Sequence, residues 1–282
     1  MVINLKVTIM YFVFFRPLLT NIIPLPASPL DISFNYLKDM FKLTIQDHQK
    51  DIDYENPRDF IDVYLTEMKT NPNFDEEHLV VLCLDFFQAG SETTSTTLLW
   101  VVIFMTLYPK VQEKCHKEIS DQIGTRPPML EDSKSLIYVN ATLIEIQRLA
   151  IVAPGSLPHI LMKDTSTHGY EFKAGTIFSA NLTKYLMDPV AFPNPEEFKP
   201  ERFLDGDQKI KKIEHFVPFG IGKRICMGES LARNELFIFF VRLIQRVNFQ
   251  PTQNKPSVKN YYPSGITRIP KPFEVKVVSN FQ

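Results

Sequence analysis

The chain has 282 residues, of which 44% are hydrophobic and 22% are charged, so it is long and apolar enough to bury a globular core. Its formal net charge of −1 argues against a nucleic-acid binder that relies on a general basic field. Its three cysteines contain no CxxC pair, which excludes a disulfide scaffold and a standard zinc cluster and suits a reducing compartment.

The chain begins with a segment that resembles a signal sequence, in which Lys6 precedes the apolar run Val7–Phe15. That run is too short to span a bilayer, and no small-residue cleavage site follows it. The longest charge-free run, Thr93–Pro109, is also too short and favours a buried core helix. We therefore expect no transmembrane segment, and we expect an irregular connection over the proline-rich residues 16–30.

The first half of the chain shows helical spacing of apolar residues. The pattern predicts helices over Asp31–His48 and Asp59–Met68. Asp75 is a candidate N-cap for a helical pattern that continues unbroken to Pro109. A helix of about 30 residues is about 45 Å long, enough to cross a whole domain.

The second half of the chain mixes helices with short strands. Alternating polar and apolar residues over Thr165–Asn181 predict a short hairpin around Gly169 and Gly175. The other expected elements are helices over Lys110–Ile123 and Ser135–Ala153 separated by a Pro127–Pro128 turn, a proline-rich coil over Asp188–Asp207, an apolar helix over Glu229–Val247, and short strands around Pro263–Pro272. The fold class predicted is mainly α, with a long central helix and a small β region.

The sharpest chemical pattern is the segment FGIGKRICMG, Phe219–Gly228, directly before the apolar helix. A helix N-terminus offers positive potential and free N–H groups, which favour the thiolate form of Cys226 as a metal ligand. Gly222 and Gly228 would let the backbone pass close to a flat cofactor, and Arg224 could pair with an anionic group on it. A buried structural cysteine in a glycine-containing turn is the alternative, which this combination of residues disfavours.

The same segment matches FxxGxRxCxG, the haem-binding signature of cytochromes P450, at every specified position, so the chain resembles that family. The resemblance implies haem b whose iron is ligated by the thiolate of Cys226. It also implies that Arg224 and His159 contact the haem propionates. The residues that the resemblance assigns to cofactor binding are Cys226, Arg224, His159, Phe219, Gly222, Gly228, Ala89 and Gly90.

Three further motifs resemble the family in the same order. The motif AGSET, Ala89–Thr93, implies that Glu92 delivers protons and that Thr93 hydrogen-bonds dioxygen or water. A Ser/Thr-rich helix that bonds its own backbone is the alternative interpretation. The motif EIQR, Glu145–Arg148, implies a structural triad with Arg202 of PERF. The distal pocket would be lined by Phe86, Phe87, Ala89, Gly90, Thr94, Pro154–Leu157 and Gly265–Thr267.

The chain is short for this family. The sequence around its motifs is similar to that of the animal microsomal clan, whose members carry an N-terminal membrane anchor and a WxxxR motif. The single tryptophan, Trp100, has no Arg four residues on. We therefore interpret residues 1–282 as a partial P450 domain, the C-terminal portion of the fold. Residues 1–30 would form an irregular leader, and residues 31–282 the helices and the haem-binding core.

The resemblance implies a haem-thiolate monooxygenase that inserts one oxygen atom from O2 into an apolar lipid, steroid, terpenoid or xenobiotic substrate. It implies NADPH–cytochrome P450 reductase as a partner, the cytosolic face of the endoplasmic reticulum membrane as the location, and no nucleic acid. An N-terminal anchor absent from this chain would give the membrane association. Two alternatives stay open: a P450-fold isomerase or dehydratase that needs no reductase, and an inactive truncated fragment with an interaction role. The lysines that would favour reductase docking are Lys209, Lys211, Lys212 and Lys223.

Overall fold

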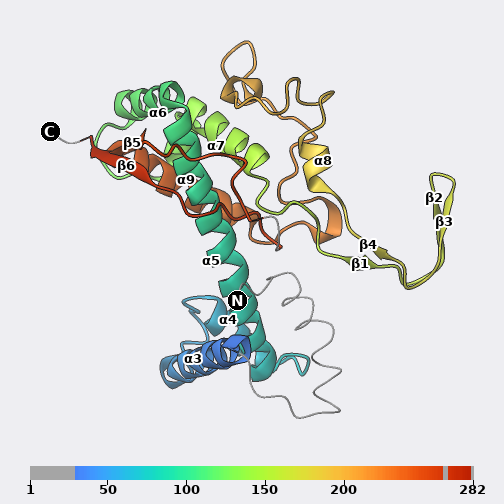
Figure 1. The fold of residues 1–282 in the computed structure, drawn as a ribbon. Coiled ribbons are helices and arrows are strands. Elements are labelled where there is room, and N and C mark those ends of the chain that lie inside the picture. The colour runs from blue at the N-terminus through green and yellow to red at the C-terminus, as the bar shows by residue number, and fades with distance from the viewer. Residues whose placement is uncertain (1–28, 263–265, 281–282) are drawn as a thin grey trace. The chain divides into compact units, whose positions relative to one another are not determined.

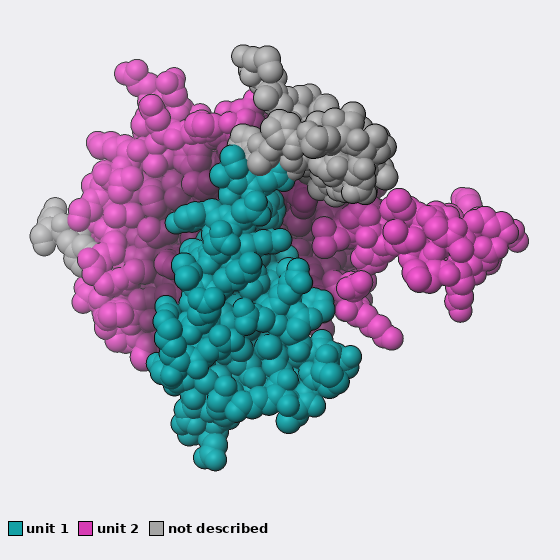
Figure 2. All heavy atoms as spheres, turned by 90° about the horizontal axis from the view of Figure 1, so that it is seen from below, with its two compact units in different colours: residues 1–92 teal, residues 93–282 magenta. Residues whose placement is uncertain are grey.

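The computed structural model describes residues 29–262 and 266–280, so the predictions for residues 1–28 and for Gly265 lie outside the described residues. The chain divides into two compact units, residues 1–92 and residues 93–282 (Figure 2). Helices dominate the described residues, whose named strands form three separate two-stranded antiparallel sheets. This architecture agrees with the mainly α prediction.

The first unit is built from α3 (Pro29–Asp51), α4 (Phe60–Met68) and the first part of α5 (Glu76–Leu107) (Figure 1). The N-cap predicted at Asp75 is present, and the structure adds a second N-cap at Asp59. Asp59 accepts hydrogen bonds from the N–H groups of Ile61 and Asp62 at 2.9 and 3.1 Å, and Asp75 accepts from His78 N–H at 2.8 Å. The main apolar cluster of the first unit consists of Ile45, Tyr64, Leu65, Leu79, Val80 and Cys83.

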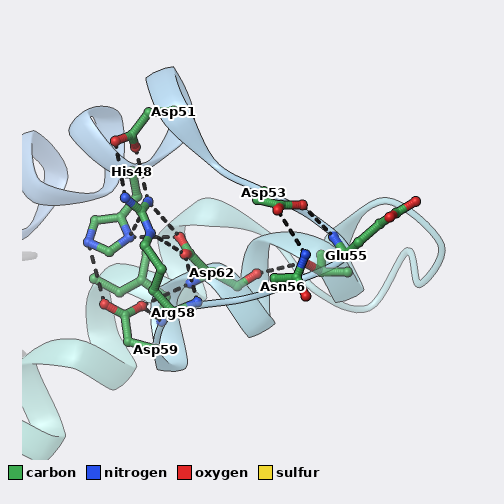
Figure 3. Close-up of polar contacts among 10 residues, drawn as sticks. His48, Asp51, Asp53, Glu55, Asn56, Arg58, Asp59 and Asp62 are labelled. Carbon is green, nitrogen blue, oxygen red and sulfur yellow. Dashed lines mark hydrogen bonds and ion pairs between the residues drawn. The ribbon is translucent and has the colours of Figure 1, made fainter.

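A charged network fastens the end of α3 to the start of α4 (Figure 3). The Arg58 guanidinium donates to Asp62 at 2.7 Å and, through both terminal nitrogens, to Asp51 at 3.1 and 3.0 Å. His48 Nδ1 lies 2.8 Å from the second Asp62 oxygen. Because the Asp62 side chain is fully buried, these partners offset the cost of removing its charge from water.

The long central helix is present as α5, which runs for 32 residues through Gly90 without a break. In the described part of the chain, no single helix is long and apolar enough to cross a membrane. Only the pair α5 and α6 (Pro109–Gln122), bent by 107° between them, meets the length and composition of a span.

The second unit has its core where the C-terminal part of α5 meets α6, α7 (Ile137–Ala150) and α9 (Glu229–Arg246) (Figure 1). The apolar faces of these helices carry the period expected of core-facing helices. Aromatic rings contribute much of the core, including a stack of Phe104 on Phe198 with ring centroids 4.7 Å apart. Its largest fully buried side chains include Trp100, Phe104, Met105, Ile119, Leu136 and Phe240.

The helix predicted over Ser135–Ala153 is shorter at both ends. Before α7, residues Leu130–Lys134 form the 3-10 helix η2, because the Asp132 carboxylate accepts from Met129 N–H at 2.7 Å and closes a separate turn. After α7, Ile151 adopts a left-handed backbone with φ 44° and ends the helix.

The hairpin prediction is correct in its first part only. Strands β2 (Thr165–Thr167) and β3 (Tyr170–Phe172) pair around His168 and Gly169, whose positive φ angles of 50° and 81° suit a two-residue hairpin turn. The rest of the predicted hairpin belongs to another sheet. Strand β4 (Ile177–Phe178) pairs with β1 (His159–Ile160), so the β2–β3 hairpin is an insertion between β1 and β4.

The C-terminal strands lie on either side of the predicted position. Strand β5 (Val247–Pro251) begins with the residue predicted to end the helix and pairs with β6 (Val275–Ser279). Between them, in the part of this segment that the structure describes, the pairing is one isolated bridge, Tyr261 with Pro270, since prolines cannot donate to a ladder. The predicted coil over Asp188–Asp207 contains the 3-10 helix η3 (Pro200–Phe203), and a short helix, α8 (Leu182–Leu186), precedes it.

Candidate functional site

The Cys226 loop is a compact turn that ends at the N-terminus of α9. Gly220 and Gly222 have φ angles of 81° and 76°, a left-handed backbone that side-chain-bearing residues rarely adopt. The loop closes on itself, because Cys226 N–H donates to the Phe219 carbonyl at 2.9 Å and Ile225 N–H donates to the Gly222 carbonyl at 3.1 Å. The cysteine is therefore held three residues before the first turn of α9, as the sequence predicts.

The loop around this thiol carries exposed apolar side chains together with exposed Lys223 and Arg224. Cys226 is exposed, and so are Ile221 (71%), Ile225 (47%) and Met227 (83%). A Cβ added to Gly228 would lie 3.9 Å from Cys226 Sγ, so a side chain here would crowd the sulfur. An accessible soft ligand in a loop with exposed apolar and basic side chains fits a metal-containing group that has an apolar face and anionic substituents.

The other two cysteines are unsuited to ligation. Cys83 is buried among the apolar side chains of the first unit. Cys115 is fully buried in the core of the second unit, where burial raises the pKa of its thiol to about 12. Since the thiolate is the form that binds metals, Cys226 is the cysteine that can serve as a ligand.

Arg224 and His159 are both exposed donors in the second unit. Arg224 ends the 3-10 helix η4 (Gly222–Arg224), two residues before the cysteine. His159 begins β1, where it pairs with Phe178. Each side chain can donate hydrogen bonds to a carboxylate, which is the role that the sequence assigns to it.

The predicted triad is assembled in the interior of the second unit. Glu145 and Arg148 are fully buried on α7, with Arg148 Nε 2.7 Å from one Glu145 oxygen. Arg202 Nε of η3 donates to the other oxygen at 2.8 Å. The two guanidinium groups also donate hydrogen bonds to backbone carbonyls. The triad therefore links α7 to the segment 186–202.

The middle of α5 is largely exposed, although the rings of Phe86 and Phe87 contact Phe60 and Phe41, with centroids 5.1 and 5.9 Å apart. Residues 85–92, which include Phe86, Phe87, Ala89, Gly90 and Glu92, are exposed, whereas Thr94, Thr96 and Thr97 are buried. Thr97 donates to the Thr93 carbonyl at 2.8 Å, so part of the alternative interpretation, a threonine-rich stretch bonding its own backbone, is present. No neighbouring heavy atom lies within 4 Å of a Cβ built on Gly90.

The predicted lining segments of the second unit have mixed exposure. Residues 154–156 are partly buried and Leu157 is exposed. Ile266 is exposed and Thr267 partly buried.

One cluster in the first unit has the composition of a metal site. Ligand atoms of His48, Asp59 and Asp62 lie within 4.8 Å of one another (Figure 3). However, both Asp62 oxygens accept hydrogen bonds from Arg58, which already supplies the positive charge. The cluster is therefore an ion-pair network that needs no cation.

Two contributors to the site have no motif of their own in the sequence. Arg233 of α9 donates to Glu229 at 2.8 Å and stacks on the Phe219 ring, 4.9 Å from its centroid. It therefore fastens the first residue of the loop to the helix that follows. Lys199 N–H donates to Glu145 at 3.0 Å and adds to the donors that the Glu145 carboxylate accepts from in the triad. Helical spacing from Glu229 to Arg233 is the one sequence feature that could have indicated the first contact.

Comparison with known proteins gives a consistent assignment. The family model described as Cytochrome P450 matches residues 3–277. Cytochrome P450 2U1 of Homo sapiens is 42% identical over 276 residues, covering 92% of this chain and 50% of that protein. Cytochrome P450 2J3 of Rattus norvegicus is 44% identical over 252 residues, covering 84% of this chain and 50% of that protein. Cytochrome P450 2J2 of Homo sapiens is 42% identical over 261 residues, covering 90% of this chain and 51% of that protein.

The chain spans about half the length of the curated relatives it matches. Within that half, the match includes the Cys226 loop, the Glu145–Arg148–Arg202 triad and the long helix α5. The resemblance predicted from these motifs is confirmed, and this chain belongs to the cytochrome P450 family.

Proposed function

We propose that this chain is the haem-binding portion of a haem-thiolate monooxygenase, with Cys226 as the axial ligand of haem b. The observation that supports this most directly is the exposed Cys226 thiol in a closed glycine loop that also carries exposed apolar side chains. A porphyrin would cover Ile221, Ile225 and Met227, and this burial of apolar surface would contribute to binding.

The polar contacts to the cofactor come from side chains that can donate hydrogen bonds. Arg224 and His159 would donate to the propionate carboxylates, and the Arg224 guanidinium would supply a charge-assisted bond. Phe219, Gly222 and Gly228 would keep the loop in shape and leave space near the sulfur. The family resemblance also assigns Ala89 and Gly90 of α5, which have no bulky side chains, to cofactor binding.

Haem, when bound, supplies the reductive activation of dioxygen from which one oxygen atom enters the substrate. The chain contributes the groups that hold and move protons. The Glu92 carboxyl would exchange protons with water, and the Thr93 hydroxyl would donate and accept hydrogen bonds beside it. The Cys226 thiolate would donate an electron pair to the haem iron.

The substrate class we propose is a small apolar molecule, such as a lipid, steroid, terpenoid or xenobiotic. Exposed Leu157 after α7 supports it, because such a side chain binds apolar ligands and excludes water. We propose NADPH–cytochrome P450 reductase as the electron donor and the endoplasmic reticulum membrane as the location. The exposed lysines Lys209, Lys211, Lys212 and Lys223 would attract an acidic partner.

Haem titration of the purified chain tests the ligand, and the need for an electron donor tests the reaction. We expect the haem that binds to give the long-wavelength Soret band of a thiolate-ligated, reduced carbon monoxide complex. We expect any oxidation of an apolar substrate to require both NADPH and added reductase. Conversion of a lipid hydroperoxide without an electron donor would instead identify an isomerase or dehydratase.

A further inference from the structure

Arg268 is a buried cation in the second unit that the proposed mechanism does not use. In the described part of the chain it forms no ion pair with a carboxylate, and its buried Nε has no hydrogen-bond partner. Desolvation lowers the pKa of this guanidinium from its usual value. A buried guanidinium without a counter-charge must be stabilised by the other groups that it contacts.

The side chain of Arg268 caps the C-terminus of α7. One terminal nitrogen donates to the carbonyls of Leu149 and Ala150 at 2.9 and 3.3 Å, and the other donates to Val258 at 3.2 Å. The carbonyls of the last helical turn have no partner within the helix, and the negative end of the helix dipole attracts a cation. Arg268 thus takes the role that a glycine cap or a lysine of the last turn plays elsewhere.

The backbone of Arg268 connects two further elements. Its N–H donates to the Val152 carbonyl at 2.8 Å, and its carbonyl accepts from Trp100 Nε1 of α5 at 2.9 Å. The guanidinium also lies over the rings of Tyr261 and Trp100, 4.0 and 5.2 Å from their centroids. One residue therefore joins α5, the end of α7 and the segment 258–261.

The residue enclosed by these contacts is strained. Ile151 has φ 44°, a conformation that is unfavourable for a β-branched side chain. Arg268 binds the carbonyl before it, on Ala150, and the carbonyl after it, on Val152. Such strain persists only where surrounding contacts fix the backbone, and it is typical of functional segments.

The segment that leaves this corner is the one we propose as part of the substrate pocket. At its far end, the Pro154 carbonyl accepts a hydrogen bond from Thr183 N–H at 3.2 Å. Ser156 N–H donates to the Ala180 carbonyl at 2.9 Å. Resting on the proposed function, we propose that Arg268 is the positioning residue that sets the course of residues 152–157 toward the substrate. It acts through Ala150, Ile151 and Val152 and does not itself touch the reacting atoms.

Hydrogen exchange on three variants tests this without requiring haem. Arg268→Met keeps the length of the side chain and removes its donors, Arg268→Lys keeps the charge, and Arg126→Met is the matched control. Arg126 also donates to a carbonyl, that of Pro127, but belongs to the turn before α7. We expect about tenfold faster exchange at Ile151 and Ser156 in Arg268→Met, a smaller change in Arg268→Lys and none in Arg126→Met.

Trp100 provides a second readout, because it is the only tryptophan in the chain. We expect Arg268→Met to shift its fluorescence emission and Arg126→Met to leave it unchanged. Unchanged exchange over residues 151–156, or an equal increase in every peptide including α6, would overturn the proposal. The second result would mean that Arg268 supports only global stability.

Ligand titration connects the segment to substrate. In the haem-bound fraction, the affinity for imidazole reports access to the iron. The affinity for 4-phenylimidazole also depends on contacts between its phenyl ring and the pocket wall. We expect Arg268→Met to weaken the binding of 4-phenylimidazole about tenfold more than the binding of imidazole. Arg268→Lys should restore part of the lost affinity. An unchanged ratio would contradict the assignment to the substrate pocket. Absence of a thiolate spectrum in the unsubstituted chain would contradict the proposed function instead, and hydrogen exchange would then decide the role of Arg268.

Discussion

At the scale of single residues, the three cysteines separate by their surroundings. Cys226 is exposed in a loop, whereas Cys83 and Cys115 are buried in two different cores. A thiolate that binds a metal must be accessible, so these surroundings support the ligand role that we propose for Cys226.

Cys226→Ser should therefore remove thiolate ligation. A serine hydroxyl is a harder and much weaker ligand for haem iron, so we expect the long-wavelength Soret band of the reduced carbon monoxide complex to disappear. Cys83→Ala is the control and should keep the band. A thiolate spectrum in Cys226→Ser would reassign the ligand.

Glu145→Gln should destabilise the second unit. Glu145 is fully buried and accepts from Arg148, Arg202 and the Lys199 N–H, so an amide would leave two guanidinium groups without their counter-charge. We expect a loss of about 3–5 kcal/mol in the free energy of unfolding, measured by denaturant titration. Asp121→Asn, which removes the exposed ion pair with Lys117, should cost less than about 1 kcal/mol. Equal effects of the two variants would mean that the triad contributes no more than a surface pair.

At the scale of secondary-structure elements, Gly124 follows the end of α6 because the chain there adopts a left-handed backbone. Gly124 has φ 63°, and its N–H donates to the Ile119 carbonyl at 3.1 Å in a helix-terminating turn. No atom lies within 4 Å of a Cβ built on Gly124, so an added methyl group meets open space.

Gly124→Ala should isolate the cost of the left-handed backbone. We expect the free energy of unfolding to fall by about 1–2 kcal/mol, measured by denaturant titration. Gly206→Ala is the matched control, since its site is equally open but its φ is not in the left-handed region. It should be neutral or slightly stabilising. A neutral Gly124→Ala would show that this turn relaxes without strain.

The α3–α4 network makes an acid-sensitive contribution to the first unit. Hydrogen bonds from Arg58 hold the pKa of Asp62 well below its usual value. Because the pKa is lower in the folded state, the stabilisation is complete above the unfolded pKa of about 4 and is lost as pH falls toward the folded pKa.

Asp62→Asn should therefore flatten the acid limb of the stability curve. Below pH of about 4, we expect the slope of unfolding free energy against pH to correspond to up to one proton fewer than in the unsubstituted chain. Arg58→Gln should give a similar flattening, because it removes the cause of the low pKa of Asp62. The measurement is denaturant unfolding at a series of acid pH values, and an unchanged slope in both variants would contradict it.

At the scale of the whole molecule, much apolar surface is exposed within each unit. In the first unit it includes Ile32, Leu43, Phe60 and Val63, and in the second it includes Leu157, Met162, Met227 and Phe239. Exposed apolar patches of more than a few hundred Å² usually mark a surface that binds something. A folded state that is stable by only about 5–15 kcal/mol is sensitive to the loss of such contacts.

The 282-residue chain purified by itself should therefore self-associate and bind less than one haem per polypeptide, with little NADPH-dependent oxidation. Sedimentation velocity and iron analysis measure the first two properties. A soluble monomer with one haem and turnover coupled to NADPH oxidation would show that the exposed apolar surfaces need no further cover.

Several features of this protein follow from local sequence and needed no structure. Asp59 and Asp75 identify helix starts because capping depends on adjacent backbone N–H groups. The loop around Cys226 is defined by residues within one short segment, and its motif identifies the family. The motifs of the buried triad are equally readable, although the sequence separates Glu145 from Arg202.

Other features depend on partners that are distant in sequence, and only the tertiary structure decided them. The end of α7 at Ile151 is fixed by Arg268, and the strand partner of Ile177–Phe178 is β1, beyond an intervening hairpin. Similarly, β5 finds its partner in β6 across the proline-containing segment that the pattern had favoured for strands. Local propensity determines where a helix begins or a turn closes. Long-range hydrogen bonds determine which segments pair and where strain is tolerated, because their energy depends on a fold that no local window contains.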